Sequence, residues 1–167
     1  MSTVINFNTF LHSKQVLQIG RQLFNTNDVS LLEKALKECS PEFSRVFILN
    51  DRVQGFAIVK QRSSTVDTYE LAFLGIHPES QGQGAGSRLL RSFQTALPTD
   101  SSAWLLVNQD NTSAQNLYSK FGFHILCECL DPFLVPCYIM MRKTPVSPKL
   151  YAHKSNNHAI MPILDIY

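Results

Sequence analysis

The segment LGIHPESQGQGAG, residues 74–86, carries the most information about the fold of this 167-residue chain. It opens as the apolar end of a predicted strand, which Pro78 ends because proline has no N–H for a sheet ladder. Gly82, Gly84 and Gly86 then alternate up to the start of a predicted helix. Uncovered backbone N–H groups at the positive end of a helix favour an anion, most simply a phosphate or pyrophosphate. A glycine-rich turn without a ligand is the structural alternative.

Two familiar phosphate-binding loops do not fit this segment. A Walker loop ends in Gly-Lys-Ser/Thr, whereas Gly86 is followed by Ser87 and Arg88. A dinucleotide-binding loop has the spacing Gly-x-Gly-x-x-Gly and an acidic residue about 20 positions later. Here the spacing is Gly-x-Gly-x-Gly and the later position holds Trp104. The predicted anion site therefore belongs to neither class.

Upstream of the segment, the apolar pattern changes from helical to extended. The predicted elements are a strand over 3–7, helices over 14–24 and 27–40, a hairpin of strands over 45–49 and 53–59, and a strand over 69–76. The second helix is expected to start with a capping box, in which Ser30 and Glu33 satisfy each other's backbone donors. A polar loop is predicted over 63–67. The strand over 69–76 is apolar at nearly every position, as expected of a central strand covered on both faces.

Downstream, a strand-then-helix pattern repeats before two closing strands. The predicted elements are a helix over 84–97, a strand over 103–107, a helix from the cap Asn111 to Phe121, and strands over 123–130 and 137–141. Gly122 is expected to end the second of these helices in the left-handed conformation. The two last strands are expected to be antiparallel. The order β-α-α-β-β-β-α-β-α-β-β predicts an α/β sandwich with a mixed sheet.

Composition limits the class of protein. Hydrophobic residues make up 44% and charged residues 17% of the chain, which suits one domain with a single core. A net charge of +2 disfavours a sequence-specific nucleic-acid binder or a protein of anionic membranes. No apolar run approaches the roughly 20 residues of a membrane-spanning helix, and the first residues lack the features of a signal peptide. We therefore expect a cytoplasmic, intracellular protein.

The cysteines and histidines predict neither a disulfide framework nor a metal site. Cys39, Cys127, Cys129 and Cys137 are too few and too irregularly spaced for a framework in a chain of this length. No Cys-x-x-Cys motif or histidine pair completes a zinc set. We expect reduced thiols and no metal.

The composition shifts after residue 143. The last stretch has three prolines, few periodic apolar residues and the apolar end IMPILDIY. We expect a domain over 1–143 and a C-terminal extension over 144–167. Because its end is apolar, the extension is expected to dock on its own domain or on a partner subunit, and a homodimer is compatible with this pattern.

Further motifs accompany the glycine loop. Asn111, Leu117-Tyr118 and Gly122-Phe123 follow it in the second strand-then-helix unit. With residues 74–86 they resemble the GNAT superfamily of acyl-CoA-dependent N-acetyltransferases, and the order of elements matches that family. The resemblance covers residues 3–143. It implies an α/β fold with a mixed, mostly antiparallel sheet, splayed central strands and helices on both faces.

The resemblance implies acetyl-CoA as co-substrate. In that family the Gln/Arg-x-x-Gly-x-Gly/Ala loop holds the pyrophosphate by backbone amides, and the pantetheine arm lies in a slot between the splayed strands. The residues carried over by position are Leu74, Ile76, Gln81, Gly82, Gln83, Gly84, Ala85, Gly86 and Asn111. Asn111 also suits a helix cap, and both roles stay open. Gly75 is expected to mark a bulge of the strand or a close backbone approach.

Two residues become candidates for proton transfer by the same resemblance. Tyr118 matches the general acid that protonates the leaving thiolate; its alternative is an ordinary core residue on an apolar helix stripe. Glu70 matches the glutamate base of the histone acetyltransferase branch by its offset from Ile76; its alternative is a solvated residue near a strand start. Strand alternation predicts that Glu70 shares a face with Leu74 and Ile76.

The predicted function is acetyl transfer from acetyl-CoA to a primary amine, in a protein lysine or a small molecule, by direct attack in a ternary complex. A covalent cysteine route is the weaker alternative, because Cys127, Cys129 and Cys137 have no motif partner to lower their pKa. From other classes, the alternatives are a catalytically silent module that binds an acyl-CoA or a protein partner, and a nucleotide-binding protein that uses the same loop. The resemblance assigns acceptor selection to residues 14–43 and 130–138.

Overall fold

The computed structural model describes residues 1–63 and 67–143. The predicted C-terminal extension, residues 144–167, lies outside the described residues, as does most of the polar loop predicted over 63–67. Ser63 itself is the last residue of a strand. The extension and its docking therefore stay predictions.

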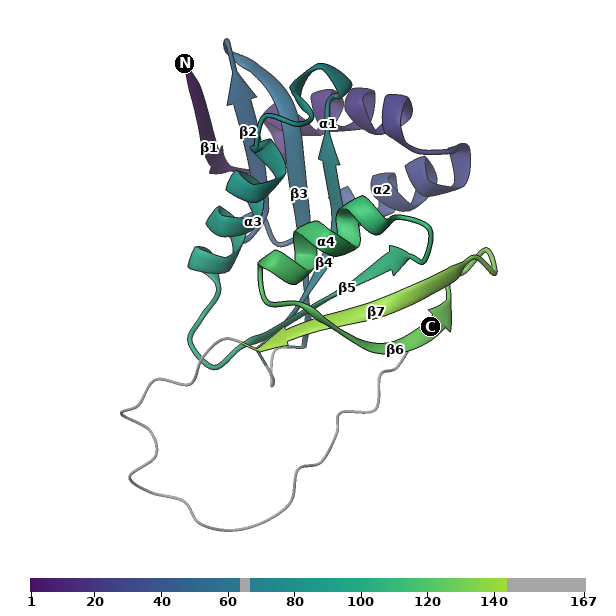
Figure 1. The fold of residues 1–167 in the computed structure, drawn as a ribbon. Coiled ribbons are helices and arrows are strands. Elements are labelled where there is room, and N and C mark those ends of the chain that lie inside the picture. The colour runs from purple at the N-terminus through teal and green to yellow at the C-terminus, as the bar shows by residue number, and fades with distance from the viewer. Residues whose placement is uncertain (64–66, 144–167) are drawn as a thin grey trace, which may run out of the picture.

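One seven-stranded sheet carries helices on both faces (Figure 1). The strands are β1 (Ser2–Asn6), β2 (Arg45–Leu49), β3 (Arg52–Ser63), β4 (Thr68–Ile76), β5 (Ser102–Asn108), β6 (His124–Leu130) and β7 (Pro136–Lys143), in the spatial order β1-β2-β3-β4-β5-β7-β6. The helices are α1 (Thr9–Leu23), α2 (Thr26–Glu38), α3 (Ala85–Ala96) and α4 (Thr112–Lys120), with a short 3-10 turn, η1 (Pro78–Ser80). Neighbouring strands pair antiparallel except β4 and β5, which pair in parallel. The predicted mixed sheet and order of elements are confirmed.

The sheet separates two apolar cores. On the α1/α2 face, Val16 and Leu32 are buried with Phe56 and Ile58 of β3. On the α3/α4 face, Phe93 of α3 is buried in a cluster that also includes a residue of α4 and the alternate residues of β3. Because β3 contributes to both clusters, its two faces are both covered. Within the described part of the chain, no helix is long and apolar enough to cross a membrane.

The predicted capping box of α2 is wrong. The helix begins a turn earlier, at Thr26, and the side chain of Asn25 accepts a hydrogen bond from the N–H of Asp28. Ser30 lies inside the helix, where its hydroxyl donates to the carbonyl of Thr26 at 3.2 Å. Ser30 and Glu33 therefore cannot mark the start of α2, because an asparagine upstream already provides the cap.

Other element ends are close to the predictions. The helix α1 starts at Thr9 rather than near residue 14, because Asn8 caps it and accepts from the N–H of Leu11. Its first turn lies outside the apolar period of the sequence, and accordingly Phe10 in this turn is 94% exposed. Gly122 has the predicted left-handed conformation, with φ of 82°.

Candidate active site

The parallel pairing of β4 and β5 is short and leaves a gap in the sheet. The two strands pair over 68–70 and 102–104. Beyond that point β4 continues beside β3, and β5 continues beside β7, without pairing to each other. Figure 1 shows the two strands diverging from their shared end. The predicted splay of the central strands is confirmed, and the facing backbone edges of both strands are left without a strand partner.

Leu74 and Ile76 turn their backbone groups toward this gap. Across the β3–β4 ladder, the N–H of His77 donates to the carbonyl of Gln54 at 2.8 Å. Because hydrogen-bonding direction alternates along a strand, the backbone groups of Ile76 and Leu74 point away from β3. The carbonyl of Ile76 accepts a hydrogen bond from Nε2 of Gln81 at 3.0 Å. An extended ligand in the gap would thus meet backbone donors and acceptors of β4.

Between β4 and α3, the glycine loop adopts a conformation that requires glycine. Gly82 and Gly84 have φ of 72° and 79°, in the left-handed region that other residues rarely adopt. A Cβ atom at either position would meet nothing within 4 Å, so backbone conformation rather than space selects glycine. Nε2 of Gln83 donates to the carbonyl of Glu79 at 2.9 Å, which ties the loop to η1.

The start of α3 differs from the starts of the other helices. Asn8, Asn25 and Asn111 cap α1, α2 and α4 with their side chains. Gly84 precedes α3 and provides no side-chain cap. The first N–H groups of a helix have no partner inside the helix, so those of α3 stay available to an external acceptor. These N–H groups lie beside the glycine loop, and a helix start of this kind favours the binding of a phosphate group.

The helix α4 approaches α3 at Gly86. A Cβ atom on Gly86 would lie 3.2 Å from Cδ2 of Leu117, so glycine permits the close contact. At the start of α4, Oδ1 of Asn111 accepts a hydrogen bond from the N–H of Ala114 at 3.0 Å. Nδ2 of Asn111 makes no hydrogen bond to another described residue. The cap role is confirmed, and the amide nitrogen stays free to donate to a ligand.

Tyr118 lies on α4 in the cluster that Leu74 and Ile76 pack against. Its side chain is 8% exposed, and its ring meets that of Phe123 edge-on with centroids 6.1 Å apart. Burial raises the pKa of Tyr118 to about 12, so the phenol keeps its proton at neutral pH. Its hydroxyl makes no hydrogen bond to the other described residues. Tyr118 is thus both a core residue and a protonated donor on the α3/α4 face of the sheet.

The register of β4 shifts at Ala72 rather than at the predicted Gly75. Ile58 of β3 lies opposite Phe73, and the next residue, Val59, lies opposite Leu71, so Ala72 is the extra residue. Gly75 instead permits a close approach, because a Cβ atom there would lie 2.6 Å from Phe56 Cζ. The bulge prediction for Gly75 is wrong; of the close backbone approach that was the alternative, the structure shows side chains, those of Phe56 and Leu23, packed against the backbone of Gly75.

This shift also moves Glu70 to the other face of the sheet. Glu70 lies opposite Lys60 and Leu74 lies opposite Ala57, and positions 57 and 60 of β3 face opposite sides. Leu74 and Ile76 therefore face the α3/α4 side, whereas Glu70 faces the α1/α2 side. The prediction that Glu70 shares a face with Leu74 and Ile76 is wrong, because an extra residue in a strand inverts the alternation beyond it.

Glu70 is buried and paired with two cations. It is 9% exposed, its carboxylate accepts a hydrogen bond from Nε of Arg62, and Nζ of Lys60 lies 3.6 Å from Oε2. Lys60 also lies 3.7 Å from a carboxylate oxygen of Glu38 on α2. The alternative of a solvated strand-start residue does not hold for Glu70.

Trp104 is a residue of this region that the sequence pattern did not reveal. It lies opposite Glu70 in the last β4–β5 pair, where the gap begins. Its indole N–H is buried without a hydrogen-bond partner among the described residues. Only the parallel pairing of the two distant strands brings Trp104 and Glu70 together, so neither spacing nor composition could have indicated the contact.

The closing strands bring cysteines together without activating them. Cys129 lies opposite Cys137 across the β6–β7 ladder. The pKa of both thiols is raised, and the largest cause is the loss of solvation on burial. A raised pKa reduces the thiolate fraction, which argues against the covalent cysteine route.

Comparison with known families identifies the class of protein that this fold and loop define. The model of the Acetyltransferase (GNAT) family matches residues 14–123. The chain belongs to this family. The match includes the glycine loop, the gap between β4 and β5, and α4, and it confirms the family predicted from the sequence motifs.

Individual relatives point to N-acetyltransferases. N-alpha-acetyltransferase 30 of Schizosaccharomyces pombe is 33% identical over 88 residues, which are 50% of this chain and 58% of that protein. The chain thus aligns with little more than half the length of this curated relative. Among solved structures, Ard1 from Thermoplasma volcanium has a TM-score of 0.72 at 22% identity, over 86% of this chain and 98% of that one. Naa50 of Arabidopsis thaliana, in complex with the bisubstrate analogue CoA-Ac-MVNAL, has a TM-score of 0.65 at 20% identity, over 84% and 97%.

These structural likenesses confirm the fold. Together with the family and the N-acetyltransferase relative, they support the predicted acyl-CoA-dependent transferase class. The roles of the individual site residues stay predictions, as do the cytoplasmic location and a homodimer.

Proposed function

We propose that this chain transfers the acetyl group of acetyl-CoA to the α-amino group of a polypeptide. The observation that carries the proposal is the uncapped start of α3 next to an open strand gap. The first feature suits a pyrophosphate, and the second suits an extended arm that pairs with β4. The choice of an α-amino acceptor, rather than the lysine or small amine favoured by the sequence motifs, rests on the N-alpha-acetyltransferase relative and on the Naa50 neighbour.

In the proposed binding mode, most contacts to acetyl-CoA come from the backbone. The N–H groups of the glycine loop and of the first turn of α3, those of Gly82, Gln83, Gly84, Ala85 and Gly86, donate to the pyrophosphate. Gln81 positions the start of this loop, since its N–H donates to the carbonyl of Pro78 at 3.3 Å and its side chain to the carbonyl of Ile76 at 3.0 Å. Leu74 and Ile76 pair with the pantetheine arm, and Nδ2 of Asn111 donates to the same arm. Since backbone amides and a helix end supply this site, a net charge of only +2 is sufficient for a polyanionic substrate.

The two substrates are proposed to enter from opposite faces of the sheet. The start of α3 lies on the α3/α4 face, whereas Glu70 and Trp104 lie on the α1/α2 face where the gap begins. An acceptor amine from the α1/α2 side would meet the thioester within the gap. Glu70 lies on the α1/α2 face, not on the face of the sheet that carries the glycine loop. This position supports a role of Glu70 next to the acceptor amine.

The proposed chemistry is a single direct transfer. Glu70, or a water molecule next to it, takes a proton from the ammonium group, and the free amine nitrogen bonds to the thioester carbon. An N–H group of β4 donates to the carbonyl oxygen, where negative charge develops. The carbon–sulfur bond then breaks, and Tyr118 gives its proton to the sulfur. No other co-reactant is needed.

The acceptor class is tested with two peptides of one sequence. Both begin MVNAL and contain one internal lysine, but one has a blocked N-terminus; each is incubated with isotope-labelled acetyl-CoA and analysed by mass spectrometry. The proposal expects label on the α-amino group of the free peptide only. Equal labelling of the lysine in both peptides would overturn the α-amino class. Binding of CoA without labelling of any amine in a wider panel would favour the silent-module alternative.

The role of Glu70 is tested separately. Glu70→Gln keeps the size of the side chain but removes its ability to accept a proton. We expect kcat to fall by about 10²-fold with little change in the KM for acetyl-CoA, since general bases typically contribute that much. An unchanged kcat across pH would assign the proton transfer to solvent.

A further inference from the structure

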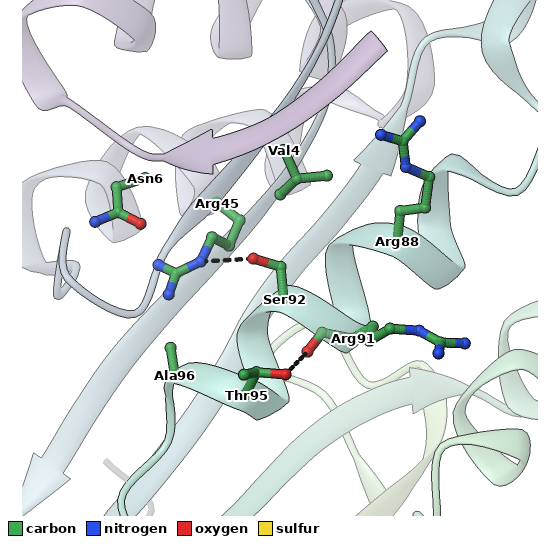
Figure 2. A pocket seen from close by; sticks show the side chains of 8 residues that line it. All are labelled: Val4, Asn6, Arg45, Arg88, Arg91, Ser92, Thr95 and Ala96. Atoms are coloured by element: carbon green, nitrogen blue, oxygen red, sulfur yellow. Dashed lines mark hydrogen bonds between the residues drawn. The ribbon is translucent and has the colours of Figure 1, made fainter.

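A groove outside the candidate active site lies between β1 and α3 (Figure 2). Its volume is about 480 Å³, within the range of small-molecule sites. The lining residues are Val4, Asn6, Arg45, Arg88, Arg91, Ser92, Thr95 and Ala96. Three of these side chains are guanidinium groups and none is a carboxylate.

Arg45 forms the inner end of this arginine groove. It is 6% exposed, and its Nε donates to Oγ of Ser92 at 3.0 Å. Its Nη1 donates to the carbonyls of Glu42 and Ser44 at 2.7 and 2.8 Å. Burial lowers the pKa of Arg45, because loss of water disfavours the charged form. All of its partners are neutral groups, and Nη2 makes no hydrogen bond within the described residues.

Arg88 and Arg91 extend the positive charge along α3. Arg88 lies over the ring of Phe47, 5.0 Å from its centroid, and donates to the carbonyl and hydroxyl of Ser2 at 2.9 and 2.7 Å. The side chain of Arg91 makes no hydrogen bond or ion pair with the described residues. Figure 2 shows Arg45 and Arg88 at opposite ends of the groove with Val4 between them, and Arg91 extending outward from the helix. An exposed arginine changes rotamer readily, so Arg91 can turn toward a ligand.

On the opposite face of the sheet, cationic side chains are paired with carboxylates. There Lys60 lies near carboxylates of both Glu38 and Glu70, and Arg62 bonds to Glu70. Buried charges are normally paired in this way because an unpaired one is costly. In the described part of the chain, the three arginines of the groove have no carboxylate within ion-pair distance. Their charge is therefore available to an external anion.

We propose that the arginine groove binds a small polyanion that carries at least two phosphate groups. Guanidinium groups bind phosphate through two parallel hydrogen bonds, which makes arginine the suited residue for this chemistry. The separation of Arg45 from Arg88 along the groove fits a ligand with several phosphates better than a single ion. This site is distinct from the glycine loop, because the groove lies on the side of α3 that faces β1, whereas Gly86 faces α4.

The test measures binding of tripolyphosphate to the full chain by calorimetry, with and without saturating CoA. The first variant is Arg91→Gln and the second is the double variant Arg88→Gln/Arg91→Gln. The control is the double variant Arg52→Gln/Lys120→Gln, which removes the same charge at exposed positions outside the groove. Thermal unfolding of each variant verifies that it is folded, and citrate replaces tripolyphosphate in a parallel series to separate phosphate from carboxylate chemistry.

We expect tripolyphosphate to bind in the presence of CoA. Arg91→Gln should weaken it by about 10-fold and the double variant by about 100-fold, as expected for loss of charged hydrogen bonds. The control should bind like the parent chain, and citrate should bind more weakly. Loss of binding when CoA is added would place the anion on the glycine loop and overturn the proposal. Equal weakening in the control, or no binding at all, would overturn it as well. The proposal is independent of the transferase reaction, since the effect of the arginine variants relative to the control tests it even if no acetyl transfer occurs.

Discussion

The strand-to-helix connections that follow β4 and β5 are built alike but end differently. Both β4 and β5 lead through a short loop into a helix on the same face. After β5, Asn111 caps α4 and satisfies the N–H of Ala114. After β4, the loop reaches α3 through Gly82 and Gly84, and no side chain caps the helix. In the β5–α4 connection a side chain of the loop caps the helix, whereas the β4–α3 connection leaves helix N–H groups available to a ligand.

This difference shows how a repeated unit can serve two tasks. An asparagine cap stabilises a helix by about 1 kcal/mol relative to alanine, and the glycine that precedes α3 gives up only a few tenths of this. In the proposed site, α3 contributes backbone groups, whereas α4 contributes the side chains of Asn111 and Tyr118. Substitutions should therefore act on ligand binding at α3 and on stability or chemistry at α4.

The largest effect is expected from Gly84→Asp. A carboxylate at the start of α3 would occupy the proposed anion site and repel the pyrophosphate, and the affinity for CoA should fall by roughly 100-fold or more. The matched control is Gly84→Asn, which brings the same left-handed backbone strain at φ 79° but no charge, so the difference between the two variants reports the repulsion. Calorimetric titration with CoA measures both. A Gly84→Asp variant that is folded and binds CoA like the control would show that α3 holds no phosphate.

The next effect tests the chemical role of α4. Tyr118→Phe removes the phenol proton while keeping the ring, and kcat should fall by about 10²-fold with little change in stability. Burial raises the pKa of Tyr118 to about 12, so the phenol stays protonated as the pH rises. The ratio of the parent rate to the variant rate should therefore stay constant between about pH 7 and pH 10. A variant with the parent kcat would leave Tyr118 as a core residue only.

A smaller effect separates the two roles of Asn111. Asn111→Ala and Asn25→Ala each remove one helix cap, and both should lower the free energy of unfolding by about 1 kcal/mol. Denaturant titration measures this loss. Only Asn111→Ala should also raise the KM for acetyl-CoA, by about three- to tenfold, since a neutral hydrogen bond to the ligand is lost. Equal KM values in the two variants would limit Asn111 to its cap.

Features that depend on local backbone chemistry could be predicted from the sequence. The glycine loop and the Asn111 cap were predictable because each rests on local backbone chemistry within a few residues. The same is true of the order of the elements, which follows from local apolar periods. The cap of α2 is ambiguous in the sequence because Asn25 and Ser30 are both residues that favour a helix start, and the structure uses Asn25.

Other features depend on contacts that no local pattern records. The extra residue at Ala72 leaves no compositional mark, yet it decides which face Glu70 occupies. The Glu70–Trp104 pair and the arginine groove join segments that are distant in the chain. In the local sequence Arg45 is an ordinary first residue of a strand, and its burial depends on the distant helix α3, where it donates to Ser92.

The smallest expected effect concerns a titratable group that takes part in a helix start, His12 of α1. The N–H of Asn8 donates to Nδ1 of His12 at 2.9 Å, and the ring lies near that of Phe7. Burial lowers the pKa of His12 below its usual 6.5, so the folded state favours the neutral ring. The contribution to stability is thus complete above pH 6.5 and is lost as the pH falls through 6.5 to the lower pKa of the folded state. His12→Gln keeps an acceptor that does not titrate, and the parent Tm should fall by about 1–2 °C more than that of the variant between about pH 7.5 and pH 5. Parallel Tm curves would mean that protonation of His12 leaves the start of α1 intact.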